Sequence, residues 1–165
     1  ESGFMKQFTN THYDVFNKLS LISKKYNNKN LLITGHSLGA ALASILAFEI
    51  KIIHQDIYNI YDLVTFGSPR VGNKYFSDMF IEYNIPSTRI THYYDIVPHI
   101  PQEFLSYQHI YGEIWYNEDN SNYKICQDQL AEDDTCSNSC APYRCTSTSD
   151  HLNYLNVSMG IEGDC

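Results

Sequence analysis

A serine at residue 37 lies within the sequence Gly-His-Ser-Leu-Gly (residues 35–39), between an apolar run and an alanine-rich helical pattern. A G-x-S-x-G turn between a strand and a helix is typical of a nucleophile elbow, which lifts the serine hydroxyl clear of a sheet. We expect Gly35 and Gly39 to be glycines because a side chain at either would collide with the neighbouring strand or helix. The N–H of Leu38 would begin the helix, where it can donate to a developing oxyanion. These residues predict Ser37 as a nucleophile and Leu38 as an oxyanion-hole donor.

Alternating helical and extended segments must position this turn. Apolar spacing predicts a helix over 4–26, a strand from 31 into the elbow, and an elbow helix to about residue 54. A buried strand at 60–66, a helix at 74–83 and strands at 87–94 and 110–116 follow, then a polar, cysteine-rich stretch (118–149) and a short helical tail (150–157). A strand, helix and strand in succession imply a right-handed parallel crossover. The pattern predicts an α/β fold with a mainly parallel sheet flanked by helices.

A serine nucleophile needs a histidine to accept its proton and a carboxylate to orient that histidine. Asp95 ends a predicted strand and is followed by apolar residues that would desolvate it, whereas Asp62 and Asp78 lie within or before other elements. Functional groups gather at the carboxyl ends of parallel strands. We therefore predict Asp95 as the acid.

Two histidines compete for the role of general base. His151 follows the last predicted strand, at the sheet edge where the nucleophile lies, while His109 opens that strand and is placed for packing or hydrogen bonding. Position alone favours His151 without excluding His109. The other five histidines are interpreted as surface or structural residues, and none has the spacing of metal ligands: they are His12, His36, His54, His92 and His99.

Length and charge limit the possible functions. The 165 residues are enough for one domain (1–165) with a buried core. The formal net charge of −8 argues against nucleic-acid binding, which needs basic side chains to neutralise phosphates. No stretch approaches the length of a membrane span. We expect a soluble protein that acts on small molecules or lipid.

The clustering of the cysteines predicts the cellular compartment in which the protein folds. Four of the five lie between residues 126 and 145, and the fifth is Cys165. Such crowding predicts disulfides and secretion into an oxidising environment, and the glycosylation sequon at residues 156–158 points the same way. A zinc site is the alternative, but no cysteine pair has C-x2-C spacing and no histidine lies among the four. We expect no metal and no cofactor.

Several segments, in order along nearly the whole chain, carry a family resemblance. They are residues 3–4, 34–40, 66–72, 95–101, 109 with 113–116, and 150–154. Together they resemble the class 3, fungal-type triacylglycerol lipase family of α/β-hydrolases. The resemblance implies an α/β-hydrolase fold with Ser37 as nucleophile, Asp95 as orienting acid and His151 as general base. The histidine that His109 resembles is not catalytic in that family.

The family also has an upstream region with the first sheet strands, a side-chain oxyanion donor and an amphipathic lid. The resemblance therefore implies that this chain is a partial class 3 lipase domain, whose sheet edge is covered by a missing N-terminal segment or a partner chain. It further implies that Cys126 pairs with Cys136, and that Cys165 pairs with a cysteine of the missing part. We take Cys140 with Cys145 as the second local bridge.

We expect a secreted lipase or related carboxylic ester hydrolase that cleaves acylglycerols through an acyl-enzyme, on a lipid or ester substrate at a lipid–water interface. Candidate walls for the acyl chain are Ile96, Val97, Ile100 and Leu152, although each suits a plain core role equally well. A phospholipase or feruloyl esterase of the same family is an alternative, since lid and pocket set the substrate. A truncated, non-catalytic lipase-like subunit is an alternative from another class, so the activity of the isolated chain stays open.

Overall fold

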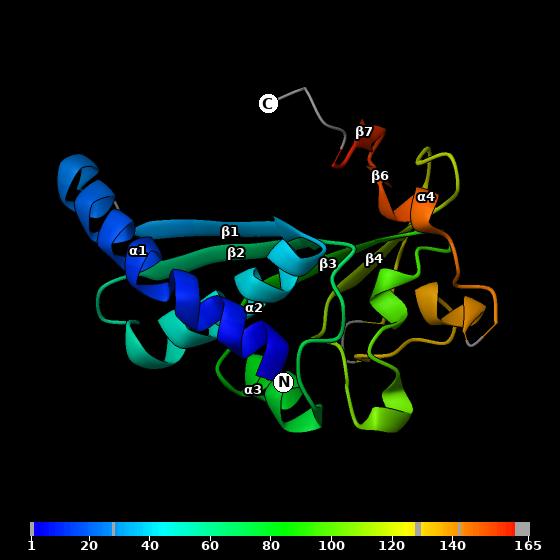
Figure 1. Cartoon of the computed structure of the whole chain (residues 1–165), viewed down its shortest axis with the longest axis horizontal. Helices are drawn as coiled ribbons and strands as arrows, with labels where there is room; N and C mark the ends of the chain where they lie inside the picture. Colours follow the sequence, from blue (N-terminus) through cyan, green and yellow to red (C-terminus); the bar gives the residue numbers. More distant parts are fainter. Residues whose placement is uncertain (1, 28, 128–129, 142, 161–165) are drawn as a thin grey trace.

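The computed structural model describes residues 2–27, 29–127, 130–141 and 143–160, arranged around a five-stranded sheet in the order β1-β2-β3-β4-β5 (Figure 1). Four strands run parallel, and the fifth is antiparallel to its neighbour: β1 (Asn30–His36), β2 (Asn59–Phe66), β3 (Ser87–His92), β4 (Glu113–Tyr116) and β5 (Tyr123–Ile125). Consecutive strands are therefore neighbours, which brings the carboxyl ends of β1 to β4 to one edge. The predicted α/β architecture with a mainly parallel sheet is confirmed.

Three helices lie on one face of the sheet: α1 (Ser2–Tyr26), α2 (Leu38–Ile53) and α3 (Lys74–Glu82) (Figure 1). Small side chains let α2 approach the strands closely, because Ala40, Ala41 and Ala47 are completely buried. The core between helices and sheet is formed by Ile33, Ala43, Ala47, Ile50, Tyr58, Ile60, Leu63, Phe80, Ile85 and Ile110. No helix in the described ranges is long and apolar enough to cross a membrane.

The opposite face of β1 is open. Ile33 contributes to the core, so its neighbours on the strand, Leu32 and Thr34, point to the other face. Leu32 is 62% exposed, and no described helix covers this face (Figure 1). Within the described residues, β1 pairs only with β2 and is an edge strand. Parallel sheets are normally covered on both faces, so this surface is incomplete for a free-standing sheet.

Two strands are shorter than predicted, for local backbone reasons. β3 ends at His92 rather than at residue 94 because Tyr93 has a positive φ of 35° and the Asp95 N–H turns back to donate to the carbonyl of His92. β4 begins at Glu113 rather than at residue 110 because Gly112, with φ 85°, interrupts the extended run. Both interruptions use backbone conformations outside the strand region.

The C-terminal third differs most from the expectation. The polar stretch contains the edge strand β5, and the tail holds only the single-turn helix α4 (Thr148–His151), followed by a hairpin of β6 (Asn153–Tyr154) and β7 (Val157–Ser158). Single-turn 3-10 helices occur at Val97–His99, Glu103–Leu105 and Ser137–Cys140. Disulfides join Cys126 to Cys136 and Cys140 to Cys145, as expected. The predicted pairing of Cys165 lies outside the described residues.

Candidate active site

Ser37 lies at the sharp turn between β1 and α2, where it has φ 56° and ψ −125°. This conformation is costly for a residue with a side chain and is held by the surrounding backbone, in part through the Ser37 N–H, which donates to the carbonyl of Phe66 at 3.0 Å. A Cβ at Gly35 would collide with the carbonyl of Gly39. Glycine is therefore required at residue 35, as predicted.

The expectation for Gly39 is wrong. A Cβ added there would meet no atom within 4 Å, because Gly39 lies on the exposed side of the first turn of α2. Leu38 is the first residue of α2, so its N–H has no acceptor within the helix and stays available at the positive end of the helix dipole. The elbow thus holds a hydroxyl and a backbone donor side by side.

The predicted histidine contacts both the serine hydroxyl and the predicted acid. His151 Nε2 lies 2.8 Å from Ser37 Oγ, and His151 Nδ1 lies 2.9 Å from Oδ2 of Asp95. Asp95 is 1% exposed, and its other oxygen, Oδ1, accepts from the N–H of Val97 at 2.8 Å. Serine, imidazole and buried carboxylate therefore form a continuous hydrogen-bonded relay. This arrangement can remove a proton from the serine hydroxyl and stabilise the resulting imidazolium.

The turn that carries His151 is fixed beside Asp95. Ser147 forms a bridge with Asp95: its N–H donates to the carbonyl of Tyr94 at 3.0 Å and its carbonyl accepts from Ile96 at 3.2 Å. The Ser147 hydroxyl then accepts from the N–H of Asp150 and caps α4. Acid and histidine are thereby tied together through their own backbone.

Tyr154 is a site residue that the sequence analysis missed. Its side chain is completely buried, and its hydroxyl donates to Oδ2 of Asp95 at 2.5 Å. Burial, followed by the adjacent Asp95 carboxylate, raises the pKa of Tyr154 well above its usual value. The phenol therefore stays protonated at neutral pH, where it can donate to the carboxylate.

Gly67 was also missed. It has φ 54°, and a Cβ there would lie 2.9 Å from Oδ2 of Asp95, 2.9 Å from the Tyr154 hydroxyl and 3.0 Å from His151 Nδ1. The absence of a side chain at residue 67 thus makes room for the acid and histidine. The Gly-Ser-Pro break after the second strand was the available signal, but it indicates only a turn.

Two further histidines, His36 and His92, have structural roles beside the segment that carries His151. The His36 ring stacks on the His151 ring with centroids 4.5 Å apart, and His92 is 2% exposed. Burial lowers the pKa of His36, so its imidazole is neutral near neutral pH. His109, in contrast, lies away from the relay: it is buried, its Nε2 donates to the carbonyl of Pro98 at 2.6 Å, and burial lowers its pKa.

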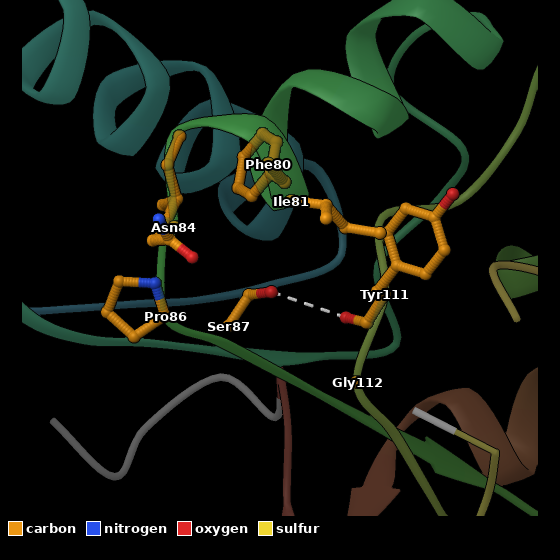
Figure 2. A pocket seen from close by; sticks show the side chains of 8 residues that line it. Phe80, Ile81, Asn84, Pro86, Ser87, Tyr111 and Gly112 are labelled. Carbon is orange, nitrogen blue, oxygen red and sulfur yellow. Dashed lines mark hydrogen bonds between the residues drawn. The ribbon is translucent and has the colours of Figure 1, made fainter. Parts of the chain in front are cut away.

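Two of the four candidate residues for the acyl-chain wall line the same cavity. Ile96 and Ile100 line a cavity of about 350 Å³ beside the acid loop, together with Phe104, whereas Val97 and Leu152 do not line it. A larger cavity, about 450 Å³, lies at the amino end of β3. Figure 2 shows the residues that line it, among them Ser87, whose hydroxyl donates to the carbonyl of Tyr111. None of the relay residues lines that cavity. None of them lines the smaller cavity either, which is the candidate substrate surface because two of the predicted wall residues line it.

The described cysteine sulfurs do not form a metal site. Each of the two groups of possible ligands in the described ranges contains a pair of cysteines, Cys126 with Cys136 or Cys140 with Cys145. Both pairs are disulfides, and zinc coordination requires free thiolates.

Known proteins of one family resemble this chain in sequence and in fold. The sequence profile of the family described as lipase (class 3) matches residues 1–105. A lipase of Rhizopus niveus is 31% identical over 99% of this chain and 41% of its own length. A secreted mono- and diacylglycerol lipase of Malassezia globosa is 30% identical over 75% of this chain and 41% of its own length.

A solved structure of a triacylglycerol lipase, whose catalytic centre is described as a serine protease triad, matches with a TM-score of 0.86 and 30% identity. The match covers 97% of this chain and 60% of that one. The chain spans about two fifths of the length of the curated relatives that it matches.

Proposed function

Because this chain belongs to the class 3 lipase family and has its α/β-hydrolase fold, we propose that it carries the catalytic centre of a secreted lipase that cleaves acylglycerols. The observation that supports this most is the relay of Ser37, His151 and Asp95, with successive distances of 2.8 and 2.9 Å. The related triacylglycerol lipase with a serine protease triad supports the same roles.

In the proposed reaction, Ser37 Oγ attacks the ester carbonyl carbon while His151 Nε2 accepts the hydroxyl proton. The Leu38 N–H donates to the oxyanion, and Asp95 holds the imidazole in its orientation. His151 then gives the proton to the departing alcohol, which leaves an acyl ester on Ser37. Water, deprotonated by His151, attacks this ester; His151 then returns that proton to Ser37 Oγ as the fatty acid leaves, which restores the free enzyme. These steps use the side chains of Ser37, His151 and Asp95, the backbone N–H of Leu38, and water.

We further propose that another polypeptide segment, upstream in the same protein or from a partner chain, completes the site. Leu38 supplies one oxyanion donor, and removal of one of two donors costs enzymes on the order of 100-fold in rate. The unpaired edge and open face of β1, with exposed Leu32, support the same proposal. One added segment that pairs with β1 can meet both needs.

The acyl chain is proposed to lie against the candidate walls Ile96, Val97, Ile100 and Leu152. Support comes from exposed apolar side chains near the relay: Ile100 is 40% exposed and Leu152 47%. An exposed apolar rim around a buried polar centre suits a substrate presented by a lipid surface. A phospholipid or a feruloyl ester remains an alternative substrate for the same relay.

An extracellular or secretory location is proposed on two grounds. Two disulfides lie within the described residues, and disulfides persist in oxidising compartments. The sequon residue Asn156 is exposed in the turn between β6 and β7, where a glycan could be attached. Several relatives are named as secreted lipases.

Substrate turnover tests the proposal. Purified chain and its Ser37→Ala variant would be assayed on emulsified triolein, phosphatidylcholine vesicles and methyl ferulate. We expect triolein to be hydrolysed fastest and Ser37→Ala to abolish the turnover. Faster cleavage of phosphatidylcholine or methyl ferulate would replace the proposed substrate class. Because the isolated chain has one oxyanion donor, its turnover should be about 100-fold below that of a complete lipase. Complete absence of turnover on all three esters by folded protein would favour a non-catalytic subunit.

A further inference from the structure

Two histidine rings, the half-buried His36 and the buried His92, reach from the ends of β1 and β3 to consecutive peptide carbonyls of the segment that carries the general base. We propose that His36 and His92 form a brace that positions His151. The inference rests on the proposed function, because it assigns a positioning role within the same relay. Neither ring touches the substrate carbonyl in this role; each acts through the backbone of residues 150 and 151.

His36 holds the segment from the nucleophile side. It is the last residue of β1, directly before Ser37, and its Nε2 donates to the carbonyl of His151 at 2.8 Å. The carbonyl can only accept, so the single proton of the neutral ring must be on Nε2. The ring also stacks on the His151 imidazole, with an interplanar angle of 28°. His36 therefore restrains both the peptide and the ring of His151.

His92 holds the segment from the acid side. It ends β3, three residues before Asp95, and its Nδ1 lies 3.0 Å from the carbonyl of Asp150. Its Nε2 lies 3.2 Å from the amide nitrogen of Asn120 and 3.0 Å from the carbonyl of Glu118. The brace uses the tautomer with the ring proton on Nδ1, which donates to the carbonyl of Asp150 and leaves Nε2 to accept from the Asn120 amide. The Asn120 side-chain oxygen in turn accepts from the N–H of Leu155 at 3.0 Å. The segment from 150 to 155 is thus held at both ends.

The two contacts are arranged nearly symmetrically about Tyr154. Its ring centroid lies 5.7 Å from the ring of His36 and 5.7 Å from the ring of His92, with an interplanar angle of 66° in each case. β1 and β3 are separated by β2 alone, so the hydrogen-bonded sheet fixes the spacing of the two donors. The carbonyls of residues 150 and 151 are therefore located relative to Ser37 and Asp95 by the sheet itself.

The segment from residue 148 to residue 158 needs such support because its own helix and strands are very short. α4 has four residues, a single turn, and β6 and β7 have two residues each. One helical turn is marginal in isolation, and a shift of about 1 Å in a reacting group can cost about 100-fold in rate. The brace supplies from the sheet the precision that a one-turn helix lacks.

Pre-steady-state acylation by p-nitrophenyl butyrate tests the brace in the full chain. The burst amplitude reports the fraction of correctly folded sites, whereas the burst rate constant reports the geometry of those sites. His36→Leu and His92→Leu remove the donors. His36→Gln places an amide N–H near the position of Nε2, and His92→Asn places one near the position of Nδ1. His12→Leu, on α1 away from the relay, is the matched histidine control.

We expect the burst rate constant to fall by about tenfold in each leucine variant, the factor typical of losing one hydrogen bond. The Gln and Asn variants should recover most of that loss. The double leucine variant should fall by more than the product of the single effects, because either donor alone still holds the segment. His12→Leu should have the rate constant of the parent.

Four results would overturn the inference. Leucine variants that lower the burst amplitude but keep the parent rate constant would show a role in folding alone. Gln and Asn variants no faster than the leucine variants would show that the donors are not what matters. A parent chain with no burst would refute the proposed function and the brace with it, whereas an active parent with unchanged variants would refute the brace alone.

Discussion

Replacing Tyr154 by phenylalanine removes one oxygen atom, which donates a 2.5 Å hydrogen bond to Oδ2 of Asp95. Tyr154 is 0% exposed and Asp95 1%, so water cannot take the place of the lost donor. A hydrogen bond to a charged group contributes about 1.5–3 kcal/mol. The ring remains, and with it the edge-on contacts to His36, Phe66 and His92. We therefore expect Tyr154→Phe to lower the free energy of unfolding by about 2 kcal/mol through the hydroxyl alone.

The same substitution should slow acylation by about tenfold, because Asp95 keeps only the Val97 N–H and His151 to fix its carboxylate. Urea unfolding and burst kinetics measure the two effects. The matched control is Tyr143→Phe, since Tyr143 is 87% exposed and its hydroxyl should contribute less than about 0.5 kcal/mol. If Tyr154→Phe proved as stable and as fast as the parent, the hydrogen bond would have no energetic role and the reasoning would fail.

Other substitutions test separate parts of the account. Gly35→Ala should destabilise by about 1–3 kcal/mol because its Cβ meets backbone, whereas Gly39→Ala, in open space on a helix, should gain up to about 1 kcal/mol; thermal melts showing equal effects would contradict this. Burial lowers the pKa of His99 from 6.5 to about 4. Its unfolded form therefore binds a proton first as the pH falls, and stability present above about pH 6.5 should decline by about 2 kcal/mol at pH 5. Urea unfolding at pH 7 and 5 should show a smaller decline in His99→Gln, and an equal decline would refute the assignment. Cys140→Ser combined with Cys145→Ser should lower the free energy of unfolding by about 2 kcal/mol, and a double variant as stable as the parent in urea would show that this short loop needs no cross-link.

The elements that depend on local pattern were predictable from the sequence. The elbow at Ser37 was visible because strand, turn and helix signals occur within a dozen residues. Asp95 and His151 could be placed because parallel strands bring their carboxyl ends to one edge of the sheet. The structure brings His151 within hydrogen-bond distance of both Ser37 and Asp95, and the catalytic roles of the three residues stay a prediction.

The groups around the relay could not be predicted, because their partners are distant along the chain. The His36 ring reaches a carbonyl 115 residues away, and the Tyr154 hydroxyl reaches a carboxylate 59 residues away. Nothing in the neighbouring sequence distinguishes such side chains from ordinary core residues. The prediction for Gly39 failed for a related reason. Gly35 and Gly39 both lie two residues from Ser37, but a Cβ would collide with backbone atoms only at Gly35.

Strand length explains the remaining differences in the fold. β5 has three residues, and β6 and β7 have two each, which is too short for an alternating pattern to be recognised. Positive φ at Tyr93 and Gly112 shortened β3 and β4, and turn conformations of this kind are poorly encoded by residue type alone. These errors shift element boundaries without moving the carboxyl edge on which the site is built.

The central claim is that Ser37 is activated by His151, and covalent labelling with a fluorophosphonate tests it most directly. The chain would be treated with the probe beside Ser37→Ala and His151→Ala, and the modified peptide identified by mass spectrometry. We predict an adduct on Ser37 of the parent that is lost in Ser37→Ala and nearly lost in His151→Ala. A folded, disulfide-bonded parent without an adduct, or an adduct on Ser37 that forms equally fast in His151→Ala, would contradict the account.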